Sequence, residues 1–287
     1  MKNKPLILLM SCNQELYGQE EEACRETFLK DAERLGIPYY FYKGTEEGES
    51  IDTTTHTMYF NVNDGLAGTS KKTLMALQTA LSLEEDWDYI IKTNVSTYLN
   101  MENITKALDK WAGREDENIY GARFIANKYS LHVPFPRGHF MILSRSMVEG
   151  LMDYALKLSQ SRNMPRTDDT LIGLSLLYYI QKILGKNYIE KTLEIPAVNE
   201  WKGDDTIDMP DFNEALCIRC KDETDKERTP DNIRLMHDTI QSGTVWDKRR
   251  YRRRYSLVET PYGITPYELY NKIIVAQEKY GKKEDEE

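Results

Sequence analysis

The sequence predicts an α/β fold with a mostly parallel sheet flanked by helices. Short apolar, β-branched runs alternate with amphipathic helical patterns over about 180 residues, and this alternation is typical of strands joined by crossover helices. Several of the apolar runs lead into small polar residues, as in Asp88–Asn100 (DYIIKTNVSTYLN). Neither an internal repeat nor a Ser/Gly linker interrupts the pattern. We therefore expect one domain.

Each element has a local reason. Strands are expected where apolar and β-branched residues run together between turn residues, and helices where apolar residues recur every three or four positions. The expected strands cover residues 5–11, 37–44, 57–62, 87–93, 117–126 and 138–144. The expected helices cover residues 19–35, 70–83, 101–113, 144–160 and a last one beginning near Asp168. Gly36 closes the first helix, and Thr69 or Ser70 is available as N-cap of the second.

After Tyr188 the pattern loosens and becomes rich in Asp, Pro and charged residues. We take residues 1–190 as the core and residues 191–287 as a C-terminal extension of the same domain. Cys217 and Cys220 lie in this extension, in a stretch whose alternation predicts a strand. With no second CxxC or nearby His pair, a zinc site there is disfavoured.

Composition narrows the class of protein. The 287 residues are 40% hydrophobic and 30% charged, with a mean hydropathy of −0.63. No stretch approaches the roughly 20 apolar residues of a membrane span, and the N-terminal apolar run is shorter than the about 7–15 residues of a signal peptide. We expect a cytoplasmic protein with reduced cysteines. The net charge of −9 argues against general nucleic-acid binding, although residues 248–255 read KRRYRRRY.

Two groups of residues could carry chemistry. Asp168 and Asp169 stand together at an expected helix N-terminus, where the pair is either an ordinary cap or a general base with an orienting partner. Lys92, Asn94 and Ser96 stand at or after a strand end, where ligands bind in open α/β sheets. No glycine-rich phosphate loop is present, so a nucleotide would be held by strand-end loops.

Five segments stand in an order that resembles the Fringe and β1,3-galactosyltransferase-like superfamily of GT-A glycosyltransferases. The resemblance covers about residues 5–185. The segments are ACRETFL (23–29), NDGLAGTSKKTLMAL (63–77), DYIIKTNVSTYLN (88–100), GHFMILSRSMV (138–148) and DDTLIG (168–173).

The resemblance implies a GT-A (Rossmann-like) fold and an inverting transfer of sugar from a nucleotide sugar, expected to be a UDP-sugar, to an acceptor hydroxyl of a glycan or glycoconjugate. Asp169 would be the base and Asp168 its partner. The extension 191–287 would complete the acceptor side. Seven further residues would face the nucleotide or neutralise its diphosphate: Ser11, Asn13, Lys72, Lys92, Asn94, Ser96 and Arg252.

The family's metal-binding acidic triplet is replaced by Asn94, Val95 and Ser96. Asn and Ser are neutral oxygen ligands, whereas Mn²⁺ and Mg²⁺ are held mainly by carboxylates. Three alternatives stay open: transfer without a metal, weak binding of a divalent cation through the diphosphate with Ser96 and His237, or loss of activity. By position alone His237 is as well explained as a packing residue.

The acceptor also stays open. A bacterial or viral enzyme acting on surface glycans is one hypothesis, and a hydroxymethylated base of phage-type DNA, contacted through 248–255, is another, because that run offers cations and tyrosines. A hypothesis of a different class is an inactive GT-A-like module that only binds a sugar or nucleotide.

Overall fold

The computed structural model describes residues 3–111, 120–126, 134–160, 165–186, 188, 192–194, 197–198, 215–221 and 225–242. A mixed eight-stranded sheet forms its centre, with strand order β3-β4-β2-β1-β5-β8-β7-β9. Its strands are β1 (Pro5–Met10), β2 (Tyr39–Thr45), β3 (Ser50–Asp52), β4 (Thr57–Asn61), β5 (Tyr89–Asn94), β7 (Tyr120–Ala126), β8 (Pro134–Ser144) and β9 (Thr192–Glu194). The pairs β2–β4, β1–β2, β1–β5 and β7–β9 are parallel, and the other three are antiparallel. The predicted α/β class is confirmed.

A second, three-stranded sheet lies beside the first and joins distant parts of the chain. It consists of β6 (Thr97–Leu99), β10 (Ala197–Val198) and β11 (Cys217–Arg219), in the order β10-β11-β6. Residues 95–96 form a tight turn after β5, and Thr97–Leu99 then form a strand rather than the open loop that the sequence suggested. In the extension, β11 pairs with β6, while the division at residue 190 stays a prediction.

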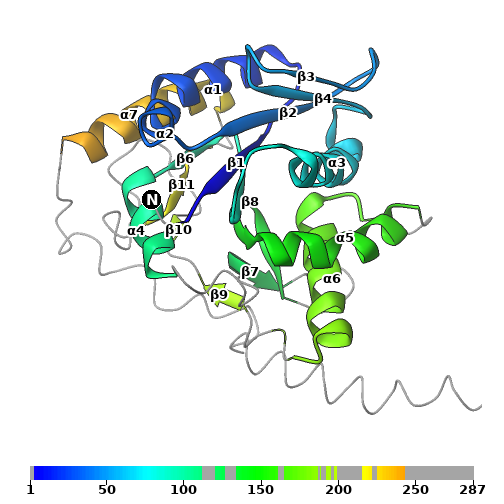
Figure 1. Ribbon diagram of the computed structural model, residues 1–287. Helices are drawn as coiled ribbons and strands as arrows, with labels where there is room; N and C mark the ends of the chain where they lie inside the picture. Colours follow the sequence, from blue (N-terminus) through cyan, green and yellow to red (C-terminus); the bar gives the residue numbers. More distant parts are fainter. Residues whose placement is uncertain are drawn as a thin grey trace, which may run out of the picture.

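Helices cover both faces of the large sheet (Figure 1). One face carries α3 (Thr69–Ser82), α5 (Arg145–Ser159), α6 (Asp168–Tyr178) and the π-helical turn Tyr179–Ile183. The other carries α1 (Glu15–Glu26), α2 (Phe28–Arg34), α4 (Met101–Lys110), α7 (Thr229–Gln241) and the small sheet. Short 3₁₀ turns, Leu66–Gly68 and Lys226–Arg228, precede α3 and α7. Within the described parts of the chain, no helix has the length and apolar character needed to cross a membrane.

The sheet separates two hydrophobic cores. In β1, Ile7 and Leu9 point into the core under α1 and α2, whereas Leu6 and Leu8 point into the core under α3, α5 and α6. A strand that is buried on both faces needs apolar residues at every position, which explains the uninterrupted apolar sequence PLILLM of β1. The polar residues that follow mark the carboxyl edge of the sheet.

The expected helix 19–35 is two helices. The chain bends at Thr27, whose φ of −117° and ψ of −112° are not helical. The Thr27 hydroxyl donates to the Ala23 carbonyl at 2.6 Å, a local bond with which threonine commonly competes with the helix. Gly36 ends α2 as expected, with a φ of +68° that favours glycine.

The prediction that Thr69 or Ser70 is the N-cap of the next helix is wrong. Gly68 is the cap residue of α3, and the hydroxyls of Thr69 and Ser70 point elsewhere. They donate to the carbonyls of Arg166 at 2.9 Å and Pro165 at 2.7 Å. These bonds tie the start of α3 to the segment that leads into α6, and so help to position Asp168 and Asp169.

Candidate active site

Lys92, Asp168 and Gly138 form the centre of the candidate site. Lys92 stands on β5 between Leu8 of β1 and Met141 of β8, and its side chain is 0% exposed. Its ammonium group forms an ion pair with Asp168 and donates to the Gly138 carbonyl. It also lies 3.3 Å from Oδ1 of Asn94. A charge so deeply buried requires such partners, because desolvation otherwise outweighs its favourable contacts. We call these residues, with Asp169, the carboxylate cluster.

A strand irregularity brings Gly138 to the cluster. Ala122 of β7 pairs with Met141, but Phe124 pairs with Pro136, so β8 has extra residues between the two pairs. Such bulges bend a strand and re-aim its backbone, and they are frequent beside active sites. A Cβ at Gly138 would lie 3.4 Å from Oδ2 of Asp169. The bulge therefore places bare backbone against the carboxylates.

Asp169 differs from its neighbour in its surroundings. It is half-buried, and its Oδ1 accepts a hydrogen bond from the Thr170 N–H at 2.7 Å. Burial raises the pKa of Asp169, the Asp168 carboxylate raises it further, and the Thr167 hydroxyl, Lys92 and Thr170 N–H oppose these effects. A carboxylate with a raised pKa is a stronger proton acceptor once ionised. This geometry suits Asp169 as a base.

Asp64 organises a second group of residues at the same sheet edge. Its Oδ1 accepts from the Gly44 N–H at 2.6 Å and from Nζ of Lys72 at 2.9 Å, and its Oδ2 accepts from the Asn13 N–H at 2.6 Å. Lys72 also donates to the Ser11 carbonyl at 2.6 Å. We call this group the Asp64 clamp. It fixes the loop after β1, and it uses the charge of Lys72 internally.

The clamp explains why residue 44 is glycine. The backbone of β2 approaches the loop of residues 62–64 so closely that a Cβ on Gly44 would lie 2.5 Å from the Val62 carbonyl oxygen. No side chain fits there unless the backbone moves. The Gly44 N–H bonds to Asp64, and the Gly44 carbonyl accepts from Nδ2 of Asn13, in the loop after β1, at 2.8 Å. The sequence did not single out Gly44 or Asp64, although NDG after a strand is a turn signal.

The clamp and the cluster are neighbours. Met10 pairs with Asn94, so the loops that leave β1 and β5 start side by side. Tyr42 lies between α3 and α6. Its hydroxyl is 3.1 Å from the Thr73 hydroxyl, and its pKa is raised by burial and also by Asp168. The structure thus brings seven predicted site residues to one sheet edge: Ser11, Asn13, Lys72, Lys92, Asn94, Asp168 and Asp169.

Ser96 and His237 have other surroundings. Ser96 is buried, and its carbonyl accepts from the Cys220 N–H at 2.9 Å, within the small sheet. His237 stands on α7, with Nδ1 3.3 Å from the Tyr98 hydroxyl. The Tyr98 ring in turn meets Phe28 edge-on at 5.6 Å between centroids. These contacts are those of a packing histidine. Arg252 and the run 248–255 lie outside the described residues.

Two glutamates next to the clamp were missed. Glu21 forms an ion pair with Lys43 at 2.7 Å and accepts from the Ser11 hydroxyl. Glu20 is only 4% exposed, and burial raises its pKa to about 7, with Glu21 adding to the rise and Lys221 opposing it. A signal was present: Tyr17, Cys24 and Phe28 recur at helical spacing around Glu20, which puts it on the buried face of α1.

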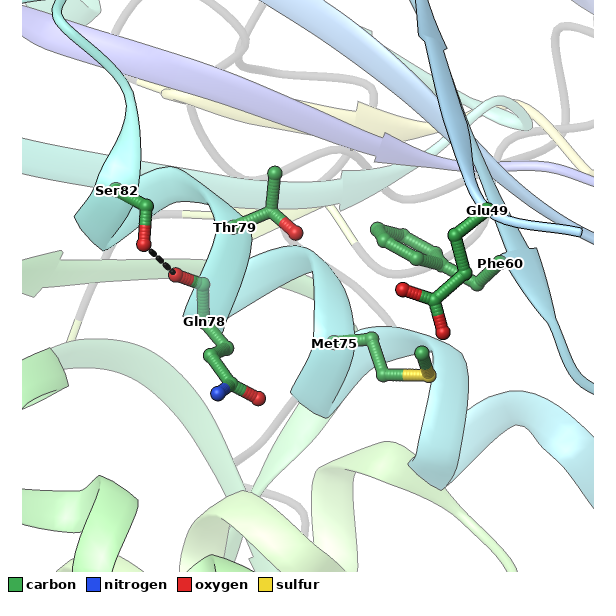
Figure 2. Close-up of a pocket in the computed structure, with 6 residues that line it drawn as sticks. All are labelled: Glu49, Phe60, Met75, Gln78, Thr79 and Ser82. Atoms are coloured by element: carbon green, nitrogen blue, oxygen red, sulfur yellow. Dashed lines mark hydrogen bonds between the residues drawn. The ribbon is translucent and has the colours of Figure 1, made fainter.

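A partly open hollow of about 270 Å³ lies elsewhere, between α3 and the edge strands (Figure 2). Its lining residues come from α3 and from β4 and the loop before β3: Glu49, Phe60, Met75, Gln78, Thr79 and Ser82. None of the predicted site residues lines it. It holds no cluster of reactive side chains, and we place the candidate active site at the carboxylate cluster instead.

Comparison with known proteins agrees with this geometry at the level of fold. A glycosyltransferase involved in the glycosylation of the major capsid of PBCV-1 superposes with a TM-score of 0.50 and 13% identity, over 81% of this chain and 99% of the other. The fold is a GT-A fold. The galactosyltransferase LgtC, solved with donor and acceptor sugar analogues, gives a TM-score of 0.44 and 8% identity over 85% of this chain and 99% of its own. No protein-family model and no curated protein sequence matches the chain.

Residues 94–96, which the family resemblance matches to an acidic metal-binding triplet, do not fit a divalent cation. Val95 is buried in the core under α1, and the Asn94 amide oxygen faces the ammonium group of Lys92, which would repel a cation. Ser96 adds only a neutral hydroxyl. Across the described ranges, no three His, Cys, Asp or Glu side chains come together as a metal site, and all four cysteines are buried free thiols.

Proposed function

We propose that this protein is a glycosyltransferase that moves a sugar from a nucleotide sugar to an acceptor hydroxyl. The observation that carries the proposal is the placement of Asp169. It is a half-buried carboxylate with a raised pKa at the carboxyl edge of β5, beside the fixed loop after β1, in a GT-A fold. In open α/β sheets this edge is where ligands bind.

The chemistry follows from one base and one leaving group. Asp169 takes the proton of the acceptor hydroxyl as that oxygen attacks the anomeric carbon. The new C–O bond forms on one side while the bond to the diphosphate oxygen breaks on the other, and the nucleoside diphosphate leaves with the electron pair. Displacement from the opposite side inverts the configuration, as the family resemblance implies. We propose a UDP-sugar as donor and a glycan or glycoconjugate as acceptor.

Neither buried lysine is well suited to bind the leaving diphosphate. Lys72 is held by Asp64 and Lys92 by Asp168, so each positive charge already has a carboxylate partner. Their support for the proposal is indirect: they fix the loop after β1 and the start of α6, between which a donor would lie. Because the metal-position residues do not fit a cation, we propose that transfer proceeds without a bound divalent metal.

A ligand-binding assay separates an enzyme from other classes. Thermal denaturation is followed with UDP, GDP, CDP and ADP, since a ligand present at 100 times its dissociation constant stabilises the folded state by about 2.7 kcal/mol. A shift with one nucleotide supports the proposal and names the donor base. No shift with any of the four contradicts it. A nucleotide shift without transfer to any glycan acceptor would favour the inactive binding module.

The base is tested by Asp169→Asn. We expect turnover to fall by about 100-fold or more while the nucleotide-induced thermal shift is kept, because the amide preserves shape but cannot accept the proton. Asp153→Asn, an exposed carboxylate on the neighbouring α5, is the matched control and should leave turnover unchanged. Unchanged turnover in Asp169→Asn would remove the base assignment.

A further inference from the structure

Lys92 is the most deeply buried charged group among the described residues, and the proposed reaction gives it no role. It lies next to Asp169, the proposed base. Its side chain is 0% exposed, against 7% for its partner Asp168. It therefore cannot touch a donor directly without a large rearrangement. The sequence predicted Lys92 as a diphosphate contact, and its burial argues for a different role.

The contacts of Lys92 join β5, α6 and β8 at one point. From the middle of β5, Nζ reaches the carboxylate of the first residue of α6 and the Gly138 carbonyl in the bulge of β8. Both partners flank Asp169: Asp168 precedes it in the chain, and a Cβ on Gly138 would lie 3.4 Å from its Oδ2. The three elements around Asp169, namely β5, α6 and the bulge of β8, thus meet at the Lys92 ammonium group.

We propose that Lys92 is a positioning residue: by holding Asp168 and the Gly138 carbonyl, it fixes the first turn of α6 so that Asp169 alone faces the acceptor hydroxyl. This role rests on the proposed function. Asp168 is engaged by a full positive charge, so it is not the proton acceptor. Asp169 is contacted by neutral donors instead: the Thr170 N–H and hydroxyl bond to its Oδ1, and the Thr167 hydroxyl also donates to its carboxylate. The pair therefore has two distinct roles although the residues are adjacent.

The geometry also predicts how the effects of substitution combine. If Lys92 acts through Asp168, removing either one disturbs the same turn, and removing both does no further harm. Groups that act as a unit are non-additive in this way, whereas groups with independent roles give losses that multiply. Misplacement of a catalytic group by about 1 Å can cost about 100-fold in rate.

The experiment is a double-mutant cycle on turnover with Lys92→Met, Asp168→Asn and the double variant. We expect each single change to lower kcat by about 10- to 100-fold with little change in KM for the donor. The kcat of the double variant should be no lower than that of the less active single variant. Lys92→Arg, which keeps the charge, should recover part of the lost kcat. Lys43→Met, which removes a lysine from the buried pair with Glu21, is the control for general destabilisation and should keep kcat.

The possible results divide cleanly. A raised donor KM with unchanged kcat in Lys92→Met would show that Lys92 contacts the donor. Losses that multiply in the double variant would show that Lys92 and Asp168 act independently, and either result would overturn the positioning role. So would a loss of kcat in Lys43→Met equal to that in Lys92→Met at matched folded fraction. If the wild-type protein transfers no sugar, the proposed function fails and this role falls with it. An active wild type with an unaffected Lys92→Met overturns the positioning role alone.

Discussion

The substitution Glu20→Gln tests how much the ionisation of a buried carboxyl group lowers the stability of the fold. The Glu20 side chain is on the buried face of α1, 4% exposed, and its Oε2 has no hydrogen-bond partner among the described residues. Burial disfavours the ionised form, so the pKa rises from an ordinary 4.5 to about 7 in the folded protein. Glutamine has nearly the same shape and carries no charge, and the substitution removes this cost.

The sign and size of the stability change follow from the difference between the pKa of Glu20 in the folded and in the unfolded state. Since the folded state holds the Glu20 proton more tightly than the unfolded state, the contribution of Glu20 to stability is most favourable below pH 4.5 and declines as the pH rises to 7. At 1.36 kcal/mol for each pKa unit, the full cost of ionised Glu20 is about 3 kcal/mol. We therefore expect Glu20→Gln to be more stable than wild type by about 3 kcal/mol at pH 8 and by less than about 1 kcal/mol at pH 5.

The assay is urea unfolding at several pH values between 5 and 8.5, with thermal denaturation in parallel. For a chain of this length, about 3 kcal/mol corresponds to a rise in Tm of roughly 5 °C. Glu22→Gln is the matched control, because Glu22 is on the same helix but exposed. A difference between wild type and Glu20→Gln that is the same at pH 5 and pH 8, or that Glu22→Gln reproduces, would refute the reasoning.

Two further predictions concern the clamp and the metal position. Asp64→Ala should lower the free energy of unfolding by about 3–5 kcal/mol, because it leaves the buried Lys72 ammonium without a negatively charged partner. Urea unfolding measures this, and Asp86→Ala, in an exposed pair with Lys4, should change little; similar behaviour of the two variants would contradict the clamp. Turnover should be the same in EDTA and in added Mn²⁺, because Asn94 and Ser96 offer a cation only neutral oxygens and the Lys92 ammonium lies against Asn94. Activity that EDTA abolishes and Mn²⁺ restores would show that a cation is bound after all.

Local patterns determined most of the fold. Unbroken apolar runs such as that of β1 appear because these strands are buried on both faces, and the helical repeats mark the stripes that cover them. The same patterns placed Asp168 and Asp169 at the start of a helix, and the structure has them there. Such features depend on residues within a few positions of one another, which is why one sequence is enough to predict them.

The partners of the charged groups were decided only by the tertiary structure. The sequence predicts Lys92 and Lys72 as cations that neutralise a diphosphate, but each is buried and is paired with a carboxylate of the protein. Asp168 comes from a distant segment of the chain, whereas Asp64 lies only eight residues before Lys72. Likewise Thr69 looks like a helix cap and instead bonds to Arg166. Sequence spacing sets which side of an element a residue occupies, whereas the packing of one element on another sets which charge it meets.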